Sequence, residues 1–200
     1  YPSCHNGSTS LGLRAGATGQ NLTEWQFGIA SVSPRWNVSG TYMQVLPRFV
    51  SVDSEGVERE FLSEYFEDEY EALSAVFLKG YQWPFHCEKL SGSSVIDLLV
   101  YREKNERGRR VYLDFKKNPF GLPEIEFDKL SAEAYEYLKG AEACFGTPIE
   151  RLRKMNMPAV ELYKGKGRDI EEEYLEIALC AQHHNGGYGV DMWWQTAVSG

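Results

Sequence analysis

Apolar and polar positions along the chain predict several amphipathic helices. The clearest pattern lies at 53–80, where aromatic and aliphatic residues keep to one helical face between many glutamates. The acidic residues are therefore interpreted as the solvated face of a helix rather than as a metal cluster. A run of small residues predicts a helix over 10–17, closed near Gly19, and apolar residues on one face predict another over 127–141. Ser94 has a capping-box context that predicts a helix ending at Gly108.

Two further helices are predicted from their start signals. Thr147 to Glu150 is a capping box with proline at the first helical position, and Pro158 favours the start of a short helix that ends near Gly165.

Strands are predicted between these helices by alternating or β-branched and aromatic runs. The predicted strands cover 22–33 with its turn, 42–52, 111–115 and 175–180. Residues 36–40 are predicted to form a loop, and Pro47 indicates an edge position or a break in the second strand. The elements together predict an α+β fold.

Composition narrows the class of protein. The 200 residues are 42% hydrophobic and 14% aromatic, which suffices for one good core with satellite segments. A net charge of −8 argues against a nucleic-acid partner, since phosphate binding needs a basic face. No stretch reaches the roughly 18 to 20 apolar residues of a membrane span. Four widely spaced cysteines form neither a disulfide framework nor a CxxC pattern, so we expect reduced thiols and a cytoplasmic location.

The densest chemistry lies near the C-terminus, in the run from His183 to Gly187. Imidazoles can move protons, so His183 and His184 are candidate catalytic residues. Gly186 and Gly187 allow a backbone to approach a flat ligand that any Cβ would push away. The Cys-x-x-His spacing of Cys180 to His183, with His184, leaves a metal site as an alternative, although a fourth ligand is missing.

Two other segments carry candidate anion sites. Asn6, Gly7 and Ser8 form a turn that leads into a helix N-terminus, which suits a phosphate, and a capped surface helix is the alternative. Arg109 and Arg110 end a basic run that either contacts an acidic substrate or complements a helix dipole.

The two ends of the chain differ from its middle. Both ends carry glycine-rich turns and strands without enough helix to cover them, whereas residues 47–174 are mostly helical. An inserted domain flanked by two pieces of its host domain would produce this pattern. Because the chain stops without a cap or polar tail, we expect it to be a piece of a longer protein.

Four short segments, in this order and at these intervals, carry a family resemblance over essentially the whole chain. They are Ala15-Gly16-Ala17, Glu24 to Phe27, Arg107 to Asp114 and His184 to Gly187. The combination is similar to the FAD-dependent flavoprotein subunits of the succinate dehydrogenase and fumarate reductase superfamily. The resemblance implies a capping domain at 47–174, inserted between two segments, 1–46 and 175–200, of an incomplete FAD-binding, Rossmann-like domain.

The resemblance also implies a cofactor and a reaction. It implies an FAD-dependent oxidoreductase as the parent protein, exchanging hydride between flavin and a small-molecule substrate. The residues expected to contact FAD are Asn6, Gly7, Ser8, Gln26, Gly186 and Gly187. The family's Gly-x-Gly-x-x-Gly should lie upstream of Tyr1, so we expect the fragment to bind FAD weakly or not at all and to need the missing remainder of its own FAD-binding domain.

The catalytic residues of the dicarboxylate enzymes do not carry over. Gly28 and Gln182 stand where those enzymes have histidines, and Ser91-Gly92-Ser93 stands where they have the proton-donating arginine. Fumarate and succinate are therefore not the expected substrates, and His183, His184 and Arg109 are the catalytic candidates for an unassigned one. Whether the isolated fragment is an enzyme is left open.

A non-catalytic protein-interaction module is the alternative. Five tryptophans and twelve tyrosines would suit a surface that packs on a partner chain.

Overall fold

The computed structural model describes residues 7–82, 85–90 and 92–199, and these divide into two compact units. The central unit is Gly28–Cys180, and the terminal unit combines Tyr1–Phe27 with Ala181–Gly200. The division falls within two strands, β2 (Trp25–Ser31) and β7 (Leu175–His184). The boundaries predicted from the sequence lie at 46/47 and 174/175, and the assignment of either unit to a capping or FAD-binding domain stays a prediction.

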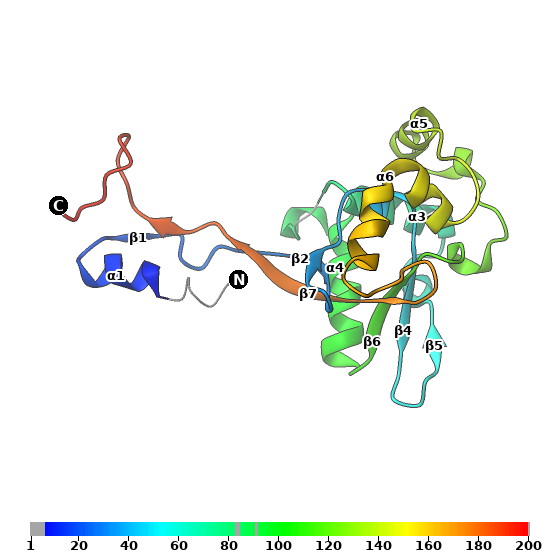
Figure 1. Ribbon diagram of the computed structural model, residues 1–200, viewed down its shortest axis with the longest axis horizontal. Helices are drawn as coiled ribbons and strands as arrows, with labels where there is room; N and C mark the ends of the chain where they lie inside the picture. Colours follow the sequence, from blue (N-terminus) through cyan, green and yellow to red (C-terminus); the bar gives the residue numbers. More distant parts are fainter. Residues whose placement is uncertain (1–6, 83–84, 91, 200) are drawn as a thin grey trace. The chain divides into compact units, whose positions relative to one another are not determined.

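A six-stranded sheet runs in the order β3-β2-β7-β6-β4-β5. Its other strands are β3 (Trp36–Asn37), β4 (Arg48–Val52), β5 (Glu58–Arg59) and β6 (Arg110–Asp114). β6 pairs antiparallel with both β4 and β7, with Leu113 opposite Phe49 on one side and Leu175 on the other. β4 and β5 form a hairpin at one edge of the sheet (Figure 1).

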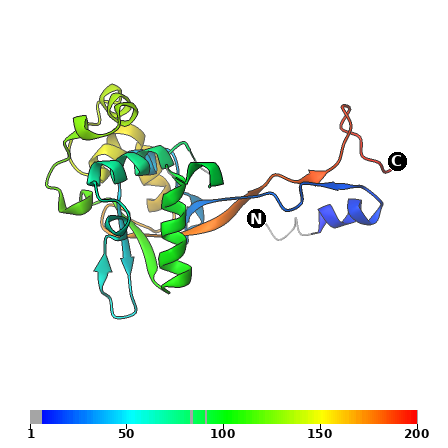
Figure 2. The ribbon, with the colours of Figure 1, turned by 180° about the vertical axis from the view of Figure 1, so that it is seen from behind.

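Four helices in the described part of the central unit share a core with this sheet: α2 (Thr41–Gln44), α3 (Glu69–Lys79), α4 (Ser94–Tyr101) and α6 (Pro148–Lys164). A further helix, α5 (Ala132–Gly140), packs on α3. α4 continues into a π-helical segment, η4 (Arg102–Glu106), beside β6 (Figure 2). Short 3-10 turns are η2 (Phe61–Glu64), η3 (Cys87–Lys89), η5 (Pro119–Gly121) and η6 (Phe127–Lys129).

One hydrophobic core joins these layers. It contains buried side chains of β4, β6 and β7 together with those of α2, α3, α4 and α6, among them Phe49, Leu113 and Tyr163. A second cluster, around Leu73, Phe77 and Leu138, lies under α5. The mixed α+β class predicted from the sequence is therefore confirmed.

Local backbone geometry explains where the predicted elements were wrong. The strand predicted at 42–52 is helical through Gln44, and Leu46, with φ of 57°, breaks the chain before β4 begins at Arg48. The helix predicted at 53–80 covers only Glu69–Lys79. The residues before it complete the β4–β5 hairpin, whose turn holds Gly56 at φ 82°, and then form the 3-10 turn Phe61–Glu64.

The start signals predicted at Thr147 and Pro158 are both seen in α6. The Glu150 carboxylate accepts a hydrogen bond from the Thr147 N–H at 2.7 Å, as a capping box requires. Asn156 has non-helical angles of φ −158° and ψ 72°, so helical geometry resumes next to Pro158, where the sequence predicts a helix start.

The terminal unit contains α1 (Ser8–Arg14) and a two-stranded sheet of β1 (Gly19–Gln20) and β8 (Gly187–Tyr188). The Tyr188 hydroxyl donates to the Thr9 carbonyl at 2.8 Å, and a Cβ at Gly12 would clash with the Tyr188 ring. Within the described residues, no helix has both the length and the apolar character to cross a bilayer.

Candidate functional site

The two glycines near the C-terminus, Gly186 and Gly187, differ in the space around their Cβ positions. A Cβ at Gly186 would overlap the backbone carbonyl of Asn21, whereas a Cβ at Gly187 would meet nothing within 4 Å. Next to the pair, the Asn185 N–H donates to the Glu24 carbonyl at 2.8 Å. Gly186 therefore serves the packing of the terminal unit, and Gly187 is the glycine with free space for a ligand.

His184 holds the same segment in place. Its Nε2 lies 2.7 Å from the Leu22 carbonyl oxygen and its Nδ1 lies 3.1 Å from that of Gly186. The imidazole also contacts the Trp25 ring edge to face, with centroids 4.6 Å apart. Both ring nitrogens thus lie within hydrogen-bonding distance of backbone carbonyls. His184 therefore connects the segment around Leu22 with the segment around Gly186.

His183 has a different environment from its neighbour. Adjacent residues of a strand point to opposite faces, and both histidines lie in β7, so their rings do not converge on one point. The His183 side chain is exposed. Within 7–82, 85–90 and 92–199, no three His, Cys, Asp or Glu side chains gather to hold a metal, so the alternative of a Cys180, His183 and His184 site is not supported.

The predicted anion site at the start of α1 is only partly described. Asn6 lies outside the described residues, Gly7 is the N-cap with φ of 93°, and Ser8 begins a helix of seven residues. Gln26 is half-buried in β2. Contact of these residues with FAD stays a prediction.

Arg109 takes part in an internal ion pair. Its Nη1 lies 2.9 Å from the buried Glu103 carboxylate, which also accepts from Arg107 at 2.6 Å. The pairs tie η4 to the start of β6, so Arg109 has a structural partner, and its contact with a substrate stays a prediction.

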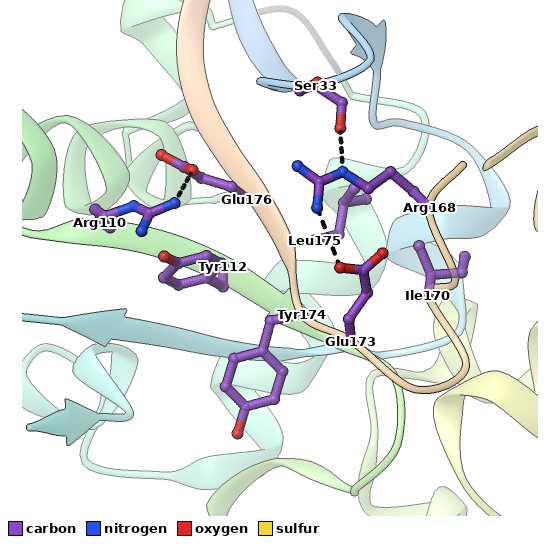
Figure 3. A pocket seen from close by; sticks show the side chains of 9 residues that line it. All are labelled: Ser33, Arg110, Tyr112, Arg168, Ile170, Glu173, Tyr174, Leu175 and Glu176. Atoms are coloured by element: carbon purple, nitrogen blue, oxygen red, sulfur yellow. Dashed lines mark hydrogen bonds and ion pairs between the residues drawn. The ribbon is translucent and has the colours of Figure 1, made fainter. Parts of the chain in front are cut away.

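Arg110 lines a small cavity of about 50 Å³ on the central unit (Figure 3). Its Nη2 lies 2.6 Å from the Glu176 carboxylate on β7. Opposite it, the Arg168 guanidinium donates to the Ser33 carbonyl at 3.2 Å and to Glu173 at 3.1 Å. The rings of Tyr112 and Tyr174 complete the wall. Apart from Arg110, these residues were not predicted as a site, because the pairing of β6 with β7 and the turn before β7 bring them together only in the folded chain.

Electrostatics make this cavity a poor anion site. The hydrogen bond from Arg110, aided by Lys104, holds the pKa of Glu176 below its usual range. Burial raises the pKa of Tyr174 and of Tyr112. Both guanidiniums already face carboxylates, so the charges are balanced. The Arg110 and Glu176 pair joins β6 to β7, and the Arg168 and Glu173 pair lies within the turn before β7.

The two glycines give a matched test of this geometry. We expect Gly186→Ala to remove the protection of the Asn185 amide against hydrogen exchange, because the added methyl would displace the Asn21 backbone. Gly187→Ala should leave that protection unchanged, since its Cβ would enter open space. Equal exchange rates in the two variants would contradict the structural role of Gly186.

Large apolar side chains of the terminal unit remain exposed. The exposed fractions are 54% for Trp25, 72% for Trp193 and 86% for Trp194.

Comparison with family models, with curated proteins and with solved structures gives no match for this chain.

Proposed function

We propose that the chain is part of an FAD-dependent oxidoreductase. In this proposal the terminal unit contributes to the FAD-binding domain and the central unit is the capping domain. The observation that supports it is the meeting of two segments of the resemblance, Glu24 to Phe27 and His184 to Gly187. They contact each other through the Asn185 and Glu24 hydrogen bond and the His184 and Trp25 rings.

The residues around Gly187 fit a flat cofactor. Open space at the Gly187 Cβ position allows the backbone to lie close to a planar ring. Gly7, Ser8 and Gln26 would complete the protein's contacts with FAD, and Gly186 would set the course of the backbone. When bound, the flavin would supply hydride exchange with the substrate.

His183 is the better candidate for proton transfer to the substrate. Its side chain is exposed, whereas both nitrogens of His184 face backbone carbonyls. Gly28 and Gln182 replace the histidines of the dicarboxylate enzymes, so the proposed substrate is a small molecule other than fumarate or succinate. The proposal includes a cytoplasmic location, based on the widely spaced cysteines.

The exposed tryptophans of the terminal unit have two explanations. In the oxidoreductase, they would pack against the remainder of the FAD-binding domain. The second candidate function is a protein-interaction module, in which the same residues, Trp25, Trp193 and Trp194, would contact a partner chain.

Expression of the complete reading frame and purification of its product distinguish the oxidoreductase from the interaction module. We expect the oxidoreductase to carry stoichiometric FAD, seen as visible flavin absorbance after gel filtration, and the 200-residue chain alone to retain little or none. Substrates can then be screened by bleaching of the flavin. A complete protein that neither retains flavin nor binds added FAD would overturn the proposal and favour the interaction module.

A further inference from the structure

A second, larger hollow lies in the central unit between the β2–β3 turn and α6. It has a volume of about 530 Å³ and is lined by Arg35, Trp36, Asn37, Thr41, Gln44 and Asn156, among others. We call it the Trp36 hollow. No sequence pattern predicts a role for these residues, and none of them lines the cavity around Arg110.

Three local features of the backbone create the hollow. The short pairing of β2 with β3 places Trp36 opposite Ser31 at the edge of the sheet. Gly40 then turns the chain at φ 59°, a value that favours glycine, and its N–H donates to the Gly80 carbonyl at 2.6 Å. Asn156 interrupts α6, and its Nδ2 donates to the Thr41 hydroxyl at 2.8 Å.

Arg35 brings a positive charge to this hollow without a carboxylate partner. Its Nη1 donates to Asn37 at 2.7 Å and its Nη2 lies 3.3 Å from the Cys180 thiol. In the described part of the chain, no Asp or Glu forms an ion pair with it, in contrast to Arg110 and Arg168. The remaining N–H groups of its planar guanidinium are free to bind an oxyanion through bidentate hydrogen bonds.

The Trp36 ring and the polar side chains that line the hollow indicate which other groups the ligand carries. The Trp36 side chain is 49% exposed and offers an indole face for stacking of a flat group. Asn37, Thr41 and Asn156 supply hydrogen-bonding groups that fix the orientation of a polar ligand. A volume of about 530 Å³ accommodates a molecule of one or two rings.

We propose that the Trp36 hollow binds a small organic anion that carries a flat ring, with Arg35 holding the anionic group and Trp36 stacking on the ring. The proposal does not depend on flavin binding, because every lining residue belongs to the central unit.

Titration with three small compounds, followed by NMR of the Trp36 indole N–H, tests this site. Benzoate carries both the charge and the ring, acetate only the charge, and benzamide only the ring. We expect saturable shifts of the Trp36 and Asn156 side-chain signals with benzoate, and weaker binding of the other two compounds. A Trp36 signal that does not respond to benzoate would overturn the proposal.

Substitution of Arg35 tests the assignment of the charge. Arg35→Gln should weaken benzoate binding by about tenfold or more, because it removes a charge-assisted hydrogen bond. Arg59→Gln is the matched control, since Arg59 is an exposed arginine on β5 outside the hollow, and it should leave the affinity unchanged. If both variants lost the same affinity for benzoate, the binding would depend only on the net charge of the protein, and the assigned site would be contradicted.

Discussion

Arg151→Met should lower the free energy of unfolding of the central unit by about 3 to 5 kcal/mol. The Arg151 side chain is fully buried in α6, and burial lowers its pKa to about 9, so it remains charged at neutral pH. Its donors bind the backbone carbonyls of Val45, Phe145 and Gly146 and the side-chain oxygen of Asn118. Methionine would leave these buried acceptors without donors, and recovered desolvation of the charge would offset only part of the loss.

Urea denaturation followed by circular dichroism measures this effect, and Arg153→Met is the control. Arg153 is two residues away on the same helix, but its side chain is half exposed and pairs with Glu171, so its loss should cost less than about 1 kcal/mol. Arg151→Lys should also be strongly destabilised, because a single ammonium cannot reach the same set of oxygens. Similar stabilities for Arg151→Met and Arg153→Met would contradict the role given to the buried guanidinium.

The case of Arg151 shows what sequence patterns miss. In the sequence it is one of several charged residues in a helix, and nothing in its spacing marks it as buried. Its burial follows from the loop of residues 141–147 and from Val45, both of which approach α6 only in the folded chain. Local signals such as the Thr147 capping box and the Pro158 start were predictable because they depend on neighbours in sequence.

The candidate sites show the same limit. The glycine pair was recognised as a place of close approach, but the sequence could not tell that Gly186 packs on Asn21 while Gly187 is open. Alternation along β7 separates His183 from His184, and this followed only once the strand was seen to extend through His184 rather than end at Cys180. The Trp36 hollow is not predictable from the sequence, because the composition of 36–40 indicates a loop, whereas β3 fixes Trp36 at a sheet edge.

Lys79→Met should lower the free energy of unfolding by about 3 to 5 kcal/mol at neutral pH. The Lys79 ammonium at the end of α3 forms an ion pair with Asp97 in the first turn of α4, and both side chains are buried. Loss of the cation would leave the Asp97 carboxyl buried without its partner, so that it must either keep its charge in the interior or take up a proton, and both cost stability. The double variant Lys79→Met/Asp97→Leu should recover most of the stability, because a well-packed apolar pair replaces the ion pair. Lys129→Met, at an exposed ion pair with Glu126, should change the stability little.

The pH dependence of Asp97 provides an independent test of this pair. Burial raises the pKa of Asp97 to about 6, and the nearby Lys79 only partly opposes this effect. Since the folded pKa lies above the unfolded value of about 3.9, the folded chain binds this proton more tightly. The contribution to stability is therefore present below about pH 4 and is lost as the pH rises through 6. We expect the Asp97 carboxyl carbon to titrate near pH 6 in NMR spectra, and at higher pH in Lys79→Met, because the cation that favours the carboxylate is gone. A midpoint near pH 4 in both proteins would show that Asp97 is solvated, in contradiction to the buried ion pair.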